Sequence, residues 1–270
     1  YTVTDVNGAS STATLTIGVD SECTDISGDR ERDFCLRKQT VLFGGTVTTG
    51  NTIVVPPTTQ NSSICATYTT EGYYKDSPSE ESNAGLYICS YKPDGNLNST
   101  SAEVVLPNAG STIKWAGLYL QSIVNDANTG TLSSMAIKIK NGSDAYVAAG
   151  SPAVVNYHNL SGSYSGYSAF IDVTSVLTSN SWVDGVYTVA NVPTTSDDYI
   201  ADLGKYGAWS LVVIYEHSSE ALTSVSIYDG WKIVSKSNAA VDIEIDNFYT
   251  PTTGSIQAEL SVFAAEGDKY

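Results

Sequence analysis

Residue types that carry catalysis are scarce in this sequence, which has two histidines, His158 and His217. His217 follows Glu216 at the end of an apolar run, and His158 stands in a loop-like segment, so we expect both to be surface loop residues. No Gly-x-Ser-x-Gly elbow, His-Glu-x-x-His motif or phosphate-binding loop occurs. The sequence therefore points to no nucleophilic or zinc-dependent chemistry.

Paired carboxylates, which a glycosidase would need, occur in three places. The pairs Asp197-Asp198 and Glu80-Glu81 stand in polar loops. Asp242 and Glu244 lie on the polar face of a strictly alternating segment, which predicts that they are solvated. We therefore expect a chain that is not an enzyme.

Calcium is the best candidate for a bound metal ion, because it prefers hard oxygen ligands in loops. No group of carboxylates has the spacing of an EF-hand, so simple solvation remains the alternative. The candidate ligands are Asp5, Asp20, Asp126, Asp197 and Asp198.

The sequence has four cysteines, and all of them lie in its first third: Cys23, Cys35, Cys65 and Cys89. No Cys-x-x-Cys occurs, and an even count in a chain of this composition indicates disulfides formed in an oxidising compartment. Of the three ways to pair four cysteines, Cys23–Cys35 with Cys65–Cys89 closes the shortest loops. We expect that pairing.

Tyrosines in Ser/Gly-rich stretches are the remaining binding feature, since tyrosine combines a large contact area with a polar tip. The candidates for holding a glycan or a protein are Tyr73, Tyr74, Tyr164 and Tyr167. The alternative is that these rings pack on the body of the domain.

The composition is that of a secreted β-protein, rich in Thr, Ser, Val and Tyr. The net charge is −16, and the only arginines are Arg30, Arg32 and Arg37. An acidic field of this strength repels a nucleic-acid backbone. No apolar run is long enough to span a bilayer, so we expect no transmembrane segment and an extracellular or cell-surface location.

Alternating apolar and polar residues predict many short strands and one short helix, at 172–178, which Asp172 can cap. Turn pairs such as Asn141-Gly142 and Asp229-Gly230 separate the strands. The segment 209–215 is apolar on both faces and should be a central strand. The expected strands are 102–106, 112–122, 134–140, 144–148, 153–157, 167–171, 185–192, 206–216, 223–235, 241–245 and 254–264.

These elements predict an all-β protein with an antiparallel β-sandwich of jelly-roll type over residues 102–270. Residues 20–101 are expected to be an irregular, disulfide-stapled β region packed on that core. Within it we expect a charged loop at 20–38 and a short strand at 41–43. Four Asn-x-Ser/Thr sequons are potential glycosylation sites: Asn61, Asn98, Asn141 and Asn159.

Residues 1–19 predict a β-hairpin around Asn7-Gly8, a pair that favours a type I′ turn. The segment resembles the closing hairpin of cadherin-like or VCBS-type repeats of bacterial surface proteins. A single hairpin is marginally stable, so it should complete an upstream domain, pair with the rest of the chain or join another copy. The residues expected to donate a strand to a neighbouring subunit are Thr12, Ala13, Thr14, Leu15, Thr16, Ile17 and Val19.

Five phrases in the second half resemble a β-rich domain of unknown function from bacterial cell-surface proteins, over about residues 102–266. Leu120 stands where that pattern usually has Trp. The phrases lie at 113–120, 169–174, 185–192, 207–216 and 226–230. The resemblance implies a surface location and no catalytic residue.

We therefore expect a non-enzymatic structural or adhesive module of a long bacterial surface protein. Its partners would be neighbouring domains of the same polypeptide, identical subunits, or a host or environmental glycan or protein. A self-assembling fibre subunit joined by strand donation is the first alternative. A carbohydrate-binding module is the second.

Overall fold

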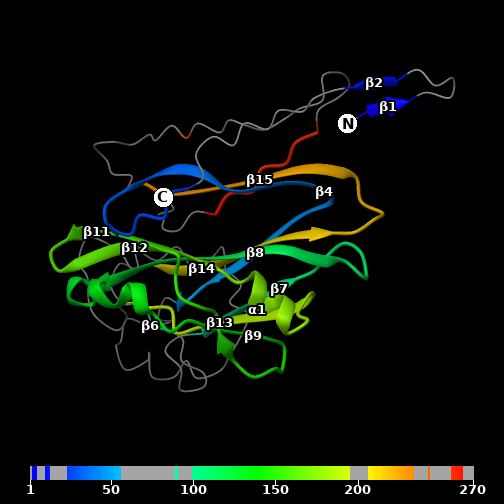
Figure 1. Cartoon of the computed structure of the whole chain (residues 1–270). Coiled ribbons are helices and arrows are strands. Elements are labelled where there is room, and N and C mark those ends of the chain that lie inside the picture. Colours follow the sequence, from blue (N-terminus) through cyan, green and yellow to red (C-terminus); the bar gives the residue numbers. More distant parts are fainter. Residues whose placement is uncertain are drawn as a thin grey trace, which may run out of the picture.

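The protein is all-β with short helical segments, as expected. The computed structural model describes residues 2–4, 10–12, 23–55, 89–90, 99–194, 206–233, 243 and 257–263. Its strands form two main sheets and two small two-stranded sheets (Figure 1). The expected strand at 241–245 lies outside the described residues except for Ile243, and residues 257–263 have no strand where one was expected.

The larger sheet has seven strands. In spatial order they are β15 (Leu222–Trp231), β4 (Arg32–Thr52), β14 (Gly207–Glu216), β8 (Thr112–Asn125), β12 (Tyr164–Asp172), β11 (Val154–Ser161) and β3 (Gly28–Asp29). All neighbours are antiparallel except β3, which runs parallel to β11.

The smaller main sheet has four strands. In spatial order they are β10 (Val147–Ala148), β9 (Lys138–Asn141), β13 (Gly185–Ala190) and β7 (Ser99–Val104). The two-stranded sheets pair β1 (Thr2–Thr4) with β2 (Ser10–Thr12), and β5 (Val54–Val55) with β6 (Cys89–Ser90). The β1–β2 pair confirms the predicted hairpin; the Asn7-Gly8 turn lies outside the described residues.

Two helical segments accompany the sheets. Helix α1 (Thr174–Ser179) confirms the expected helix, and the Thr174 amide donates to Asp172 Oδ1 at 2.9 Å. The 3₁₀ helix η2 (Asp126–Ser134) was not expected, and it delays the strand predicted from residue 134 until Lys138.

The main apolar core lies between the two large sheets. β14 contributes Trp209, Leu211 and Val213 to it, and the Trp209 indole donates to Thr100 Oγ1 of β7 at 2.8 Å. The alternate residues Val212 and Ile214 belong to a second apolar cluster on the opposite face of the same strand. The prediction of a central strand that is buried on both faces is therefore confirmed.

The second cluster exists because the long strand β4 bends and folds back. Its second half, Gly44–Thr52, pairs with β14, whereas its first half pairs with β15. A Cβ at Gly44 would lie 2.0 Å from the Tyr215 carbonyl oxygen, so the bend requires glycine there. We call the β15 strand with residues 32–43 of β4 the ribbon; it lies over the outer face of β8, β12 and β11 as a third layer (Figure 1).

Two predictions fail in the ribbon. The segment 20–38 was expected to be a loop, but β4 begins at Arg32, because β15 supplies its hydrogen-bond partners. Asp229-Gly230 was expected to be a turn, but it is a bulge within β15, where the register with β4 shifts. By contrast, Asn141-Gly142 is a turn, with Gly142 at φ +55°.

Candidate functional site

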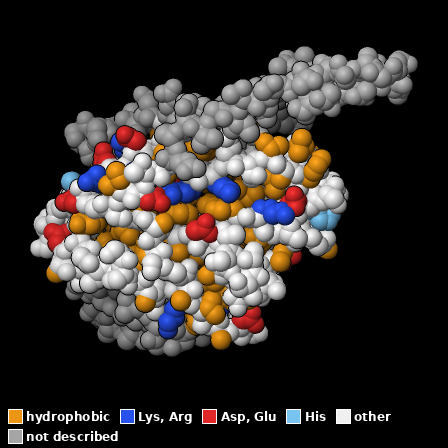
Figure 2. All heavy atoms as spheres, in the orientation of Figure 1, with side chains coloured by type: hydrophobic (Ala, Val, Ile, Leu, Met, Phe, Trp, Pro, Cys, Tyr) orange, Lys and Arg blue, Asp and Glu red, His pale blue; other side chains and the backbone are white. Residues whose placement is uncertain are grey.

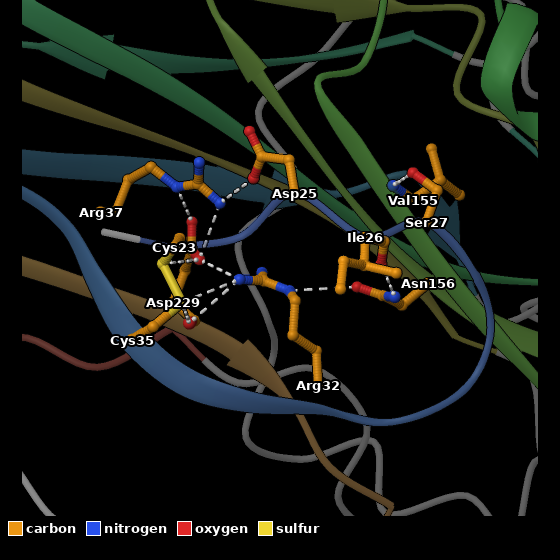
Figure 3. A network of polar contacts seen from close by, with 10 residues as sticks. All are labelled: Cys23, Asp25, Ile26, Ser27, Arg32, Cys35, Arg37, Val155, Asn156 and Asp229. Carbon is orange, nitrogen blue, oxygen red and sulfur yellow. Dashed lines mark hydrogen bonds and ion pairs between the residues drawn. A yellow bond between two sulfur atoms is a disulfide. The ribbon is translucent and has the colours of Figure 1, made fainter. Parts of the chain in front are cut away.

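The densest polar cluster of the described residues lies where the ribbon meets the sheet (Figure 3). Its centre is Asp229 of β15, whose side chain is only 7% exposed. Asp229 Oδ1 accepts from Arg32 Nη1 at 2.6 Å, and Oδ2 accepts from Arg37 Nε at 2.7 Å. Arg37 also pairs with Asp25 at 2.8 Å. Two of the three arginines of the sequence therefore converge on one carboxylate.

Buried ion pairs of this kind hold a structure together only as a complete set, because removing one partner leaves an unpaired charge. Burial alone would lower the pKa of Arg37, but its bonds to Asp229 and Asp25 outweigh burial and raise that pKa above its ordinary value. The Arg37 guanidinium also lies 4.4 Å from the centre of the Phe170 ring, which adds a cation–π contact. Arg37 thus stays charged and fixes the ribbon to β12.

Tyr119 of β8 lies under the same network. Burial raises the pKa of its hydroxyl, and the negative charge of Asp229 raises it further. The Tyr119 ring centre lies 5.1 Å from that of Phe170.

The disulfide Cys23–Cys35 joins the same cluster and confirms the first of the two predicted pairs. The second pair cannot be compared, since Cys65 lies outside the described residues. Cys35 is in β4, and Cys23 begins a segment of residues 23–31 that we call the clasp. The bond therefore ties the clasp to the ribbon.

The clasp closes the edge of the sheet at β11. The Val155 amide donates to Ser27 Oγ at 2.9 Å, and Gly28 and Asp29 pair with β11 as the parallel strand β3. Asn156 connects the clasp to the arginine cluster, because its Nδ2 donates to the Ile26 carbonyl and its Oδ1 accepts from Arg32 Nε. The clasp, the ribbon and β11 thus share one network.

The structure describes one of the five predicted calcium ligands, Asp126, and leaves the calcium prediction untested. Among the described residues, Cys23, Cys35 and Asp229 bring potential ligand atoms together, but the sulfurs form a disulfide and the carboxylate is already held by two guanidinium groups. Asp126 accepts from Ser165 Oγ at 2.6 Å and from Asn159 Nδ2 at 2.7 Å, so it ties η2 to the β11–β12 turn. The other predicted calcium ligands, Asp5, Asp20, Asp197 and Asp198, lie outside the described residues.

The four tyrosines predicted to bind a ligand have different outcomes. Tyr167 is fully buried in the main core, and its hydroxyl donates to the Pro193 carbonyl at 2.8 Å, so the prediction that it binds a surface ligand is wrong. The phrase in which it stands is Ser/Gly-rich, but it forms a strand rather than a loop. Tyr164 is half-buried at the start of β12. Tyr73 and Tyr74 lie outside the described residues.

Both histidines are at the surface, and His158 belongs to strand β11 rather than to the expected loop. His158 Nδ1 lies 2.9 Å from Asp29 Oδ1 of the clasp. His217 Nδ1 lies 2.7 Å from Ser219 Oγ and also accepts from the Ser219 amide, which makes this pair part of a tight turn after β14. These contacts give both histidines structural roles.

A hollow of about 590 Å³ opens beside the clasp. Its described lining mixes both charges and contains no Phe, Tyr or Trp: Asp29, Arg30, Glu31, His158, Asn159, Leu160 and Ile233. Sugar rings commonly stack on exposed aromatic faces, so this lining gives the carbohydrate-binding alternative no support.

Of the residues predicted to donate a strand, Thr12 ends β2, and Ala13 to Val19 lie outside the described residues. Two of the predicted sequons are engaged by the protein. The Asn141 amide donates to the Asp184 carbonyl, and the Asn159 amide donates to Asp126 and to the Gly162 carbonyl. A glycan on either amide would disturb these bonds.

Over the described part of the chain, no helix is long and apolar enough to cross a membrane. No family model, curated protein or solved structure matches this chain. The resemblance to a surface-protein domain therefore stays a prediction, and any functional assignment depends on the geometry above.

Proposed function

We propose that the chain is a non-enzymatic structural and adhesive module of a bacterial surface protein that works outside the cell. The observation that carries this proposal is the way in which its layers are fastened. A disulfide, two buried arginine–aspartate pairs and an edge clasp meet at one point. Disulfides persist in oxidising, extracytoplasmic environments.

Further support comes from the roles of the polar residues. Three polar side chains discussed above are used internally: Asp229 by arginines, Asp126 by the β11–β12 turn and Tyr167 by the core. Such an arrangement favours rigidity and display over turnover.

Adhesion is tested with beads that carry the purified chain through a single biotinylated site. We expect these beads to be retained under flow on extracellular-matrix proteins or on a glycan array more strongly than albumin-coated beads. Retention equal to that of albumin on every surface would contradict an adhesive role. Hydrolysis of any glycan on the array would contradict the non-enzymatic assignment.

A fibre subunit is the second candidate, and an exposed sheet edge favours it. Among the described strands, β15 ends the seven-stranded sheet, and its stretch Leu222–Ile227 contains none of the Lys or Pro residues that commonly protect edges. Leu222, Val41 and Phe43 are 63%, 56% and 51% exposed and lie together, since Leu222 pairs with Phe43. Figure 2 shows hydrophobic side chains gathered at its upper right, where β15 begins.

Strand donation is tested by light scattering after size-exclusion chromatography, and by negative-stain microscopy, on the chain with and without residues 1–19. Filaments or an oligomer ladder that disappear on truncation would establish the fibre. A monomer in both forms would reject it and leave the adhesive module.

A further inference from the structure

The two sulfurs of the Cys23–Cys35 disulfide have different nearest charges, and these charges belong to one ion pair, in which Arg32 Nη1 donates to Asp229 Oδ1 at 2.6 Å (Figure 3). The Asp229 carbonyl oxygen also lies 3.5 Å from Cys35 Sγ. Arg32 Nη1 lies 3.3 Å from Cys35 Sγ and can donate to it. Asp229 Oδ1 lies 3.5 Å from Cys23 Sγ. The other arginine of the cluster, Arg37, pairs with both Asp229 and Asp25.

Such an arrangement matters for thiol–disulfide exchange, in which a thiolate attacks one sulfur and the other sulfur leaves as a thiolate. A guanidinium beside Cys35 stabilises negative charge on that sulfur as it leaves. A carboxylate beside Cys23 destabilises negative charge there. Attack at Cys23 with departure of Cys35 is therefore the favoured direction.

We propose that Cys23–Cys35 is a polarised, thiol-reactive disulfide, and that a small thiol such as glutathione adds to Cys23 and unfastens the clasp. The attacking thiolate forms a bond to Cys23 Sγ, the Cys23–Cys35 bond breaks, and its electron pair goes to Cys35. A second thiol then attacks the mixed disulfide, which leaves Cys23 as a thiol and releases the oxidised thiol dimer. The two thiols supply both electrons.

Opening the bond loosens the clasp, because its other attachments to β11 are few. They are the two residue pairs of β3, the Ser27 and Ile26 contacts, the Arg30 amide bond to the Tyr157 carbonyl and the exposed Asp29–His158 pair. Loss of the clasp would uncover the β11 edge, which is a template for an added strand. The concentration of small thiols around the protein would thereby determine whether the β11 edge is covered.

The test measures which cysteine takes up the thiol. The chain is incubated with reduced glutathione, quenched with acid, alkylated and digested with trypsin. Cleavage after Arg30, Arg32 and Arg37 places Cys23 and Cys35 in different peptides, and Cys65 and Cys89 in others. We expect the early mixed disulfide at Cys23 to exceed that at Cys35 by about tenfold. Equal labelling, or preference for Cys35, would overturn the proposal.

A variant pair sharpens the test. Arg32→Gln removes the charge beside Cys35, whereas Arg30→Gln removes a neighbouring arginine that does not touch the disulfide. We expect Arg32→Gln to slow mixed-disulfide formation about tenfold and to even out the labelling, with Arg30→Gln unchanged. If Arg32→Gln does not fold, the labelling ratio of the unmodified chain decides alone.

Hydrogen exchange reports the release of the clasp. After glutathione treatment, the Val155 and Arg30 amides should exchange at least tenfold faster, while Val213 in the main core should not change. Unchanged exchange at Val155 and Arg30 in a chain shown to be modified at Cys23 would reject the opening of the clasp.

Discussion

The two faces of the seven-stranded sheet are covered in different ways. On one face the four-stranded sheet packs through a continuous apolar core, with neutral hydrogen bonds such as those from the Trp209 indole to Thr100 and from the Asn51 amide to the Ser101 carbonyl. On the other face the ribbon packs through a smaller apolar cluster, and a disulfide and two ion pairs with Asp229 surround it. Apolar burial with a few neutral hydrogen bonds holds the first layer, whereas charged pairs and a disulfide hold the second.

The difference follows from the area available. A narrow ribbon of two strands cannot bury as much apolar surface as a four-stranded sheet, and apolar burial contributes about 25 cal/mol per Å². In the ribbon, the disulfide and the ion pairs with Asp229 supply the stabilisation that apolar burial does not. The ribbon should therefore be the first part to detach, and the comparison can be tested with substitutions on each side.

The largest effect is expected in the main core. Trp209→Ala removes a fully buried ring and leaves the Thr100 hydroxyl without its donor, so it should lower the free energy of unfolding by about 4–5 kcal/mol. Urea unfolding followed by circular dichroism measures this change. Loss of less than about 1 kcal/mol would show that the main core is not the dominant layer.

The ribbon should respond next most strongly. Asp229→Asn removes the carboxylate from Arg32, while Arg37 keeps Asp25, so we expect a loss of about 3–4 kcal/mol. Hydrogen exchange should rise in residues 32–43 and 222–231 before it rises in β13. Uniform acceleration across both layers would show that the ribbon does not open separately.

Removing the disulfide should cost slightly less. The paired substitution Cys23→Ala with Cys35→Ala removes a cross-link between residues 12 positions apart, which in the chain-entropy model is worth about 3 kcal/mol. The midpoint of urea unfolding should fall accordingly. A midpoint that does not change would mean that the clasp is held by its hydrogen bonds alone.

Raising the pH tests the main core and the ribbon together, because buried tyrosines lie in both. Burial raises the pKa of Tyr167 and Tyr187 in the main core and of Tyr119 under the ribbon. Above pH 10 the unfolded chain releases these protons, whereas the folded protein keeps them. The contribution of these tyrosines to the free energy of unfolding is therefore complete below pH 10 and is lost as the pH rises above it. Each tyrosine contributes up to about 1.4 kcal/mol per pH unit.

Tyr167→Phe should make the free energy of unfolding fall less steeply above pH 10 than in the unmodified chain. Urea unfolding of both proteins at pH 8 and at pH 11 measures the difference. Phenolate absorbance in the folded protein provides the check. Ionisation of all 18 tyrosines near pH 10 without unfolding would contradict the assignment.

The smallest effect is expected at an exposed ion pair. Lys114 and Glu216 lie 2.6 Å apart, but both side chains are more than 40% exposed. Glu216→Gln should therefore change the free energy of unfolding by less than about 1 kcal/mol. A loss as large as that of Asp229→Asn would remove the distinction between buried and exposed pairs.

Much of the fold could be predicted from local pattern. The continuous apolar run at 209–215 predicted the central strand β14, and the short helix was placed within two residues of α1. The pair Cys23–Cys35 followed from its short loop. These predictions succeeded because the information lies within a few neighbouring residues.

The ribbon and its network could not be predicted in the same way. Arg32 and Asp229 are 197 residues apart, and Asp229-Gly230 has the local composition of a turn. The charges that look like a loop at 30–38 become strand residues only because β15 supplies both the hydrogen bonds and the counter-charge. The clustering of all three arginines in eight residues was the one signal that could have indicated the site.

The sequence by itself determined the all-β class, most strands of the second half, the short helix and one disulfide. Those properties follow from side-chain periodicity, turn propensity and loop length, which act over short stretches of chain. Tertiary structure alone decided that β4 bends at Gly44, that the ribbon forms a third layer, and that Asp229 faces two arginines. These features depend on groups that only the folded chain brings within 3 Å of each other, so no local pattern contains them.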